Sequence, residues 1–311
     1  MLVGTAGGSA DLPTASYYVP ALTIYKSALM WYYSRGAKID FAVPAAPAPV
    51  HFFDSATSCP YMTAVIFDPR EGGLSREYVL ELAEVFLPSN STLPYYSIQA
   101  SVEIDPATLM PVDPELAAAF GHLRSQKDKW KVEPHLIMDY NLGVLGAPPA
   151  IREDLEVVEI PSGGCDHFAE FETFETICAA AFEYDYIPEI TAAHLSMGDT
   201  NSLELTPVTY VRLMIRRISD GCFVAVGSYM LARTLDIAYI SEIAVHPECQ
   251  KRGYGQHVVN VILSRIAGHG IPRAMLASTP EGIALYLKVG FRTVPDAATM
   301  MITSKKPKQV G

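Results

Sequence analysis

The sequence predicts a mixed α/β protein built in two parts. The chain has 311 residues and half of them are hydrophobic, which is enough for two domains with a sizeable core. Apolar β-branched segments alternate with segments whose apolar residues follow helical spacing. The stretch "GAPPAIRED" (146–154) has two adjacent prolines and a charge cluster, which are typical of a linker. We therefore expect one α/β domain over residues 1–150 and a second over residues 151–311.

The first part begins with a small, polar segment that we expect to be a loose leader (1–16). Residues 17–33 are apolar, but Pro20 and Lys26 interrupt them, so a buried or amphipathic helix is favoured over a membrane span. "LSREYVLELAEVFL" (74–87) has helical spacing behind Ser75, a residue that caps helices. The rest of this part comprises the start of a strand in "MTAVIF" (62–67), strands at 95–104 and 135–145, and a helical, charged interval at 105–133.

The second part shows a clearer order of elements. Two strands surround Asp220-Gly221, a pair that strongly favours a tight turn, so they predict a hairpin. The expected elements are a strand at 154–160, a helix at 167–184, the hairpin strands at 210–219 and 221–233, a strand at 237–245, a helix at 256–268, a strand at 273–278, a short helix at 281–289, and strands near 291–294 and 298–303.

Charge and cysteine content restrict the function classes. The formal net charge of −11 argues against a surface for nucleic acid or for an anionic membrane. It would attract a cationic partner, or it only keeps the protein soluble. The amino terminus lacks the basic segment of a secretory signal. Five scattered cysteines without C-x-x-C spacing favour reduced thiols in the cytoplasm, and Cys165-Asp166-His167 lacks the second ligand pair of a zinc site, so we expect no metal.

The most informative stretch is "HPECQKRGYGQ" (246–256), which lies between an apolar strand and a helix. A helix that begins at such a turn exposes unpaired backbone N–H groups at its positive end, and glycines let the main chain approach a ligand closely. The pattern predicts a phosphate site. No G-x-x-x-x-G-K-[ST] run exists, and Val258 stands where a dinucleotide-binding fingerprint needs its third glycine.

"QKRGYG" (250–255) resembles the pyrophosphate-binding signature [QR]-x-x-G-x-[GA] of the GNAT superfamily of acyl-CoA-dependent N-acetyltransferases. "EGIALYLKVGFR" (281–292) looks like that family's other signature, in the expected order and spacing. The resemblance spans residues 155–303 and implies a GNAT-like fold with a central mixed, mostly antiparallel sheet. Residues 1–150 show neither signature. They would be a diverged copy of the fold that lost its phosphate turn, which we favour, or an unrelated domain on the substrate side.

The resemblance also implies which residues hold the cosubstrate, acetyl-CoA. The strand with Ile243, Ala244 and Val245 should splay from its neighbour through a bulge, so that its backbone pairs with the pantetheine arm. Tyr286 should lie near the thioester sulfur. The pyrophosphate should rest on the amides of Gln250, Lys251, Arg252, Gly253, Tyr254, Gly255 and Gln256.

The implied reaction is acetyl transfer to a primary amine by direct attack in a ternary complex. Tyr286 is the candidate acid, although it would also suit a core position beside Ile283. Glu242 is the candidate base, but strict alternation places it on the face opposite Tyr239, unless a bulge intervenes. The Val245 amide is the candidate donor to the thioester carbonyl. His246 reads as a loop residue, and Cys249 is not expected to act as a nucleophile.

Residues 165–189 carry seven acidic and six aromatic side chains and no Lys or Arg. In similar proteins this region forms one wall of the acceptor groove, and such a wall would suit a cationic amine, small or peptidyl. An ordinary amphipathic helix with a solvated acidic face explains the same pattern. Two other functions remain open, a non-catalytic acyl-CoA sensor and a partner-binding scaffold. Neither the acceptor nor the oligomeric state follows from the sequence.

Overall fold

The structure is a computed structural model of the whole chain. It describes residues 75–86, 97–145, 152–160, 167–182, 208–232 and 236–304, together with the backbone of three short strands, β1 (Lys38–Ile39), β2 (Val50–Phe53) and β3 (Ala64–Phe67). The leader and the helix expected at 17–33 lie outside the described residues. So do Cys165, Asp166 and the end of the acidic, aromatic stretch.

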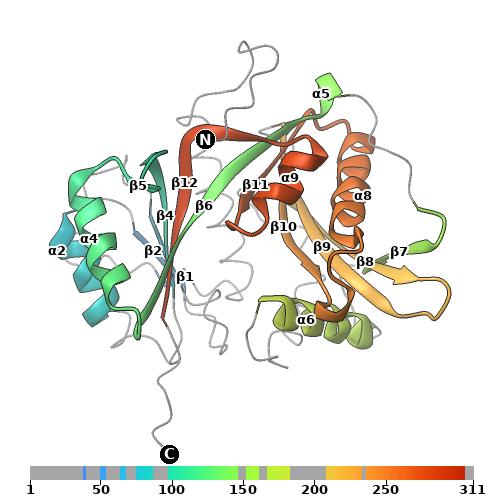
Figure 1. Cartoon of the computed structure of the whole chain (residues 1–311), viewed down its shortest axis with the longest axis horizontal. Helices are drawn as coiled ribbons and strands as arrows, with labels where there is room; N and C mark the ends of the chain where they lie inside the picture. The colour runs from blue at the N-terminus through green and yellow to red at the C-terminus, as the bar shows by residue number, and fades with distance from the viewer. Residues whose placement is uncertain are drawn as a thin grey trace, which may run out of the picture.

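One sheet runs through both halves of the chain (Figure 1). Its strand order is β1-β2-β3-β4-β12-β6-β11-β10-β9-β8-β7, and β5 pairs with β4 beside this path. Within the described residues, only the pairs β3–β4 and β10–β11 are parallel. The remaining strands are β4 (Ser97–Asp105), β5 (Met110–Pro111), β6 (Trp130–Asn141), β7 (Leu155–Ile160), β8 (Val208–Arg217), β9 (Phe223–Ala232), β10 (Ile237–Val245), β11 (Arg273–Ser278) and β12 (Arg292–Ser304).

Each parallel pair is joined through a helical segment, because parallel strands need a long crossover. The second pair is joined through the 3-10 turn η5 (Pro247–Cys249) and α8 (Tyr254–Gly268). Ser75 caps the first segment as expected, since its Oγ accepts from the Tyr78 amide at 3.2 Å. The other helical elements are α2 (Arg76–Glu81), η2 (Leu82–Phe86), α4 (Pro114–Ser125), α5 (Leu142–Leu145), α6 (Phe168–Phe182) and α9 (Ile283–Val289).

The two halves repeat one order of elements and exchange strands in the middle of the sheet. In each half a parallel pair is followed by a helix, α4 or α9, and then by a long strand, β6 or β12. β6 lies between β12 and β11, and β12 lies between β4 and β6. Each half therefore receives one interior strand from the other (Figure 1). This repeat favours a diverged copy of the same fold in the first half, and the division at residue 150 stays a prediction.

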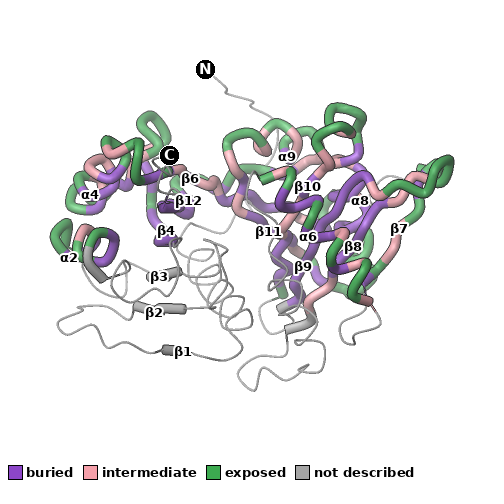
Figure 2. The backbone as a smooth tube through the Cα atoms, turned by 90° about the horizontal axis from the view of Figure 1, so that it is seen from below, coloured by how far each residue is buried: buried purple, intermediate pink, exposed green. Residues whose placement is uncertain are grey.

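Helices cover the second half of the sheet on both faces. Leu213, Ala225 and Tyr229 pack with α8 and α9, whereas Met214 and Val226 pack with α6. Because adjacent strand residues point to opposite faces, α6 and α8 lie on opposite sides of the sheet. A separate core joins α2 and α4 to β4, β6 and β12 in the first half. Figure 2 shows the buried backbone gathered along the strands between these layers.

Most elements of the second half lie within two residues of their predicted bounds. Three predictions were wrong. β6 ends at Asn141 and α5 follows it, so the expected strand does not continue to residue 145. Part of the interval expected to be helical belongs to β6, which begins at Trp130. The two strands expected near 291–294 and 298–303 form one strand, β12, with an irregularity between Thr293 and Ala298.

Candidate active site

β10 carries the expected bulge. On β9, Ser228 pairs with Ser241 and Val226 pairs with Ala244, so two residues of β10 lie opposite the single residue Gly227. The first of these two, Glu242, has a φ of 54°, which is rare for a residue with a side chain. A bulge bends its strand and increases its twist. The backbone of β10 is therefore redirected just before Ala244 and Val245.

β10 and β11 separate shortly before the bulge. Their parallel pairing covers three residues and stops at Tyr239 and Met275, although the strands continue to Val245 and Ser278. His246 donates its amide to Val224 of β9 at 3.0 Å. Amides along an antiparallel strand alternate in direction, so the Val245 amide points away from β9, toward the side where β11 has separated. This is the edge at which the sequence placed the pantetheine arm.

The glycine-rich turn directly follows this opened edge. Lys251 and Gly253 both have positive φ, 61° and 83°, and Gly253 precedes the first residue of α8. The first amide of α8 that donates to a backbone acceptor of the turn is that of His257, which donates to Gly253 O at 3.1 Å. Within the described residues, the amides from Lys251 to Gln256 donate to no backbone acceptor. They form a row of donors at the positive end of the α8 dipole, suited to an anion.

Gly255 contributes to packing at this turn. A Cβ at this position would lie 3.3 Å from Leu285 Cδ2 and 3.4 Å from Val245 Cγ2, so the missing side chain lets β10, α8 and α9 approach closely. At Gly253 the surroundings are open, with only Arg152 Nη1 at 4.0 Å from the ideal Cβ. Conformation, rather than space, requires glycine there.

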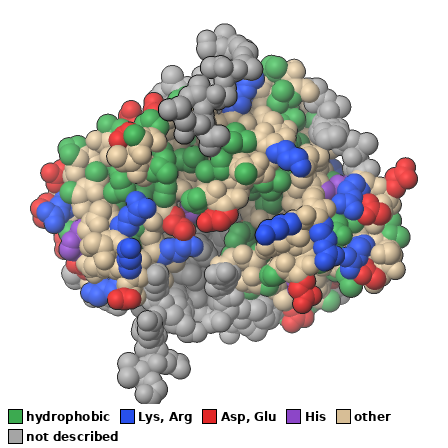
Figure 3. Space-filling view, in the orientation of Figure 1, with side chains coloured by type: hydrophobic (Ala, Val, Ile, Leu, Met, Phe, Trp, Pro, Cys, Tyr) green, Lys and Arg blue, Asp and Glu red, His purple; other side chains and the backbone are tan. Residues whose placement is uncertain are grey.

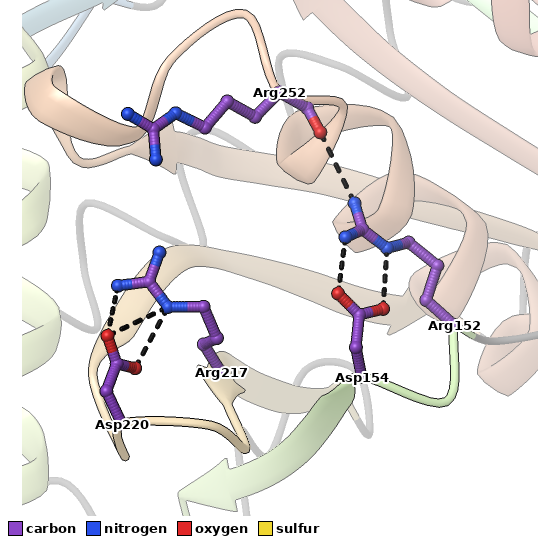
Figure 4. A network of polar contacts seen from close by, with 5 residues as sticks. All are labelled: Arg152, Asp154, Arg217, Asp220 and Arg252. Carbon is purple, nitrogen blue, oxygen red and sulfur yellow. Dashed lines mark hydrogen bonds and ion pairs between the residues drawn. The ribbon is translucent and has the colours of Figure 1, made fainter.

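Two Arg–Asp pairs border the turn (Figure 4). Arg152 binds Asp154 through Nε–Oδ1 at 2.9 Å and Nη2–Oδ2 at 2.5 Å, and its Nη1 donates to Arg252 O at 3.3 Å. Arg217 binds Asp220 in the β8–β9 turn, and hydrogen bonds to Asp220 and Tyr254 raise the pKa of its guanidinium. Basic and acidic side chains lie next to one another on this part of the surface (Figure 3). Sequence reasoning missed both pairs, because it assigned Arg152 and Asp154 to a linker and interpreted Asp220 only as a turn residue.

Tyr286 is buried on α9, behind the opened edge. Its ring meets Phe291 edge-on at 5.6 Å between centroids. The ring needs Gly282, because a Cβ there would lie 2.9 Å from Tyr286 Cε2. Burial raises the pKa of the Tyr286 phenol, and Tyr239 acts in the same direction. The phenol is therefore protonated at neutral pH. Tyr286 thus occupies the core position that the sequence allowed, and its role as an acid stays a prediction.

The bulge decides the orientation of Glu242. Strict alternation would place its side chain opposite Tyr239, but Glu242 Oε2 accepts a hydrogen bond from the Tyr210 hydroxyl of β8. Tyr210 and Tyr239 both pair with Met230 of β9, so all three point to one face of the sheet. Burial, followed by Glu242, raises the pKa of Tyr210. Glu242 thus shares the Tyr239 face, next to a phenol that keeps its proton.

Further polar groups surround this carboxylate on the face covered by α6. Ser228 Oγ lies 2.7 Å from Ser241 Oγ. The guanidinium of Arg212 lies 4.2 Å from the centroid of the Tyr210 ring and 5.4 Å from that of Phe171 on α6. Burial raises the pKa of Glu175 on α6 to about 7, and Arg212 opposes this shift. No sequence motif indicated Tyr210 or Arg212, and only their position on alternate residues of a strand could have linked them.

The histidine and cysteine candidates make no hydrogen bond to Glu242 or Tyr286 in the described part of the chain. His246 and Cys249 are half-buried beside the turn. Cys178, Cys222 and Cys249 are free thiols.

Nowhere in the described ranges do His, Cys, Asp and Glu side chains form a group that could hold a metal. In the same part of the chain, no helix is long and apolar enough to cross a membrane.

Comparison with known proteins finds a family model for part of the chain and a shared fold for most of it. Residues 219–293 match the family model described as "Acetyltransferase (GNAT) domain". No curated protein matches the chain. Three solved structures share the fold over most of both chains: a GCN5-related N-acetyltransferase from Kribbella flavida (14% identity, 92% of this chain and 96% of that chain, TM-score 0.55), one from Sphaerobacter thermophilus (13%, 94% and 91%, 0.52), and a tandem GNAT protein from the clavulanic acid biosynthesis pathway (13%, 95% and 96%, 0.53).

Proposed function

Because the chain contains a GNAT acetyltransferase domain over residues 219–293, we propose that the protein transfers an acetyl group from acetyl-CoA to a primary amine by direct attack in a ternary complex. The observation that carries the proposal is the coincidence of three features in one place. The bulge in β10, the separation of β10 from β11 and the row of amides from Lys251 to Gln256 follow one another along the chain. Together they offer an extended arm and a diphosphate suitable partners.

The proposed cosubstrate site uses backbone groups. Ile243, Ala244 and Val245 would pair with the pantetheine arm as an added strand does, and the amides from Lys251 to Gln256 would hold the pyrophosphate. The amide of Gln250, which the sequence motif included in this row, donates instead to Pro247 O at 3.4 Å. Glycine at position 253, with its positive φ, supports such a close approach. The chemistry that acetyl-CoA supplies is an activated thioester.

The reaction requires a neutral amine. A lysine-like amine has a pKa of about 10.4, so only about one molecule in a few thousand is neutral at pH 7. The amine nitrogen forms a bond to the acetyl carbon, the carbon–sulfur bond breaks, and the products are an amide and the free thiol. In balance, the amine loses a proton and the thiolate gains one.

We assign Glu242 as the base that receives the amine proton, directly or through water. Tyr210 orients this carboxylate by donating to Oε2. The Val245 amide, which points to the opened edge, would polarise the carbonyl. Tyr286 would donate its proton to the leaving sulfur and regain one from solvent, a role supported by a phenol that is protonated at neutral pH.

The acceptor that we propose is a cationic amine. The exposed Glu172 lies on α6, which covers the sheet face where Glu242 lies. Phe171 and Arg212 line the same region. The free thiols and the use of acetyl-CoA support action in the cytoplasm.

The test is an acceptor panel of polyamines, amino sugars, aryl and alkyl amines and lysine peptides, with release of free thiol as the readout. We expect turnover with at least one amine and loss of about 100-fold in kcat for Glu242→Gln. Glu156→Gln is the matched control, since this exposed carboxylate binds Arg216 on β8. Binding of acetyl-CoA without turnover on any amine would indicate a sensor. Absence of binding at high micromolar acetyl-CoA would indicate a scaffold.

A further inference from the structure

Arg152 makes a contact that bears on the phosphate-binding turn. It lies just before β7, in the stretch that joins the two halves, and is 100 residues from Arg252 in sequence. Its Nη1 donates to the Arg252 carbonyl oxygen at 3.3 Å, immediately before α8 (Figure 4). No pattern in the turn itself indicates this partner.

The contact determines where the next amide points. The Arg252 carbonyl and the Gly253 N–H belong to one planar trans peptide unit, so they point in opposite directions. A guanidinium that holds the carbonyl on one side therefore turns the Gly253 N–H to the other side. The positive charge of the guanidinium, next to the carbonyl oxygen, also polarises the peptide unit and makes its N–H a stronger donor.

Arg152 is itself held in place from two directions. Asp154 binds it through two parallel hydrogen bonds, a geometry that fixes the plane of the guanidinium. The guanidinium carbon also lies 5.2 Å from the centroid of the Tyr254 ring, in the first turn of α8. Hydrogen bonding to Asp154 raises the pKa of Arg152, and the same bond lowers the pKa of Asp154. Both groups are charged at neutral pH.

We propose that Arg152 is a positioning residue of the acyl-CoA site: by holding the Arg252 carbonyl, it aims the Gly253 amide at the cosubstrate's pyrophosphate. This inference rests on the proposed function for the identity of the ligand. Its structural part, the orientation of one peptide unit, does not depend on that function. The segment between the halves thus contributes directly to the binding turn.

The chain offers a matched control. Arg217 also forms a bidentate pair with an aspartate and also lies beside Tyr254, but it makes no contact with Arg252 O among the described residues. Arg217→Ala removes the same charge from the same neighbourhood. A purely electrostatic effect would follow from both substitutions, whereas orientation of the Gly253 peptide would follow only from Arg152→Ala.

The experiment compares wild type, Arg152→Ala, Arg152→Lys and Arg217→Ala. Titration calorimetry measures acetyl-CoA affinity, and turnover is measured with acetyl-CoA and with S-acetylpantetheine, which has no pyrophosphate. For Arg152→Ala we expect Kd for acetyl-CoA to rise about tenfold, the size of one partly exposed charge-assisted hydrogen bond, with kcat at saturation kept. Arg152→Lys should recover part of the loss. The kcat/KM for S-acetylpantetheine should not change.

Three results would overturn the proposal: unchanged acetyl-CoA affinity in Arg152→Ala, an equal loss with S-acetylpantetheine, or an equal effect of Arg217→Ala. The Gly253 amide proton shift in the ligand-free protein provides a second readout, which should change in Arg152→Ala and stay the same in Arg217→Ala. If wild type binds no acetyl-CoA, the proposed function fails while this shift still tests the positioning. An unchanged Gly253 shift in Arg152→Ala would by itself refute the inference.

Discussion

Glu175 gives the protein a specific dependence of stability on pH. This carboxyl group lies on α6, within a cluster that contains Phe171, Phe174 and Ile177, and is only 4% exposed. Burial raises its pKa from 4.5 to about 7, with Arg212 opposing the shift. A carboxyl whose pKa is raised on folding is protonated more readily in the folded state. Its protonation therefore favours folding at low pH, and this contribution is lost as the pH rises from about 4.5 to about 7.

The size of the effect follows from the pKa values. Each pH unit between them corresponds to about 1.4 kcal/mol, so the ionised carboxyl destabilises the fold by roughly 3 kcal/mol above pH 7. Most of this change, about 2–3 kcal/mol, falls between pH 5 and pH 8. Glu175→Gln keeps the shape of the side chain and removes the titration. The free energy of unfolding of the variant should therefore fall less between these two pH values, by about that amount.

Urea unfolding followed by circular dichroism at pH 5 and pH 8 measures the difference. Glu172→Gln is the control, because Glu172 lies one turn earlier on α6 and is exposed. We expect the control to keep the pH dependence of the wild type. If Glu175→Gln keeps it too, Glu175 is ionised in the folded protein at both pH values, and the account of a neutral buried carboxyl is wrong.

Three other substitutions, the last with a control substitution, test the site and its packing. Tyr286→Phe should lower kcat by about 100-fold and change the KM for acetyl-CoA by less than about twofold, since only the proton donor is removed; unchanged turnover would show that Tyr286 is not the acid. Gly253→Val should raise the Kd for acetyl-CoA at least about tenfold, because a β-branched residue resists a φ of 83°, and unchanged affinity in calorimetry would place the cosubstrate elsewhere. Gly227→Ala should destabilise the fold by about 1–3 kcal/mol in urea unfolding, because its Cβ would lie 2.6 Å from Val258 Cγ1 and 2.7 Å from Ile243 Cδ1. Gly268→Ala, at a position with nothing within 4 Å, should instead stabilise it by about 0.5–1 kcal/mol, and equal effects of the two would contradict the packing.

Local signals were sufficient for much of the second half. Asp220-Gly221 predicted the hairpin, and Gly221 adopts the positive φ of 72° that such a turn requires. The apolar run at 237–245 and the glycine turn behind it predicted a strand followed by a helix N-terminus, and both are present. These features depend on which backbone conformations a few neighbouring residues can adopt. The identities of those residues can be read from the sequence directly.

Features set by contacts distant in sequence could not be predicted. The exchange of β6 and β12 depends on which edges meet, across more than 150 residues, and no local pattern specifies a partner. The resemblance implied the bulge, but no glycine marks the position of positive φ, so the sequence did not show that Glu242 occupies it. The hydrogen bond from Tyr210 to Glu242 and the contact of Arg152 with Arg252 span 32 and 100 residues.

The most direct test of the whole account is hydrogen exchange with and without saturating acetyl-CoA. The account predicts slower exchange of amides in two segments, the end of β10 at Ile243–Val245 and the turn at Lys251–Gln256, with smaller changes elsewhere in the described chain. Binding that protects neither segment, or that protects β3 and α2 of the first half instead, would contradict it.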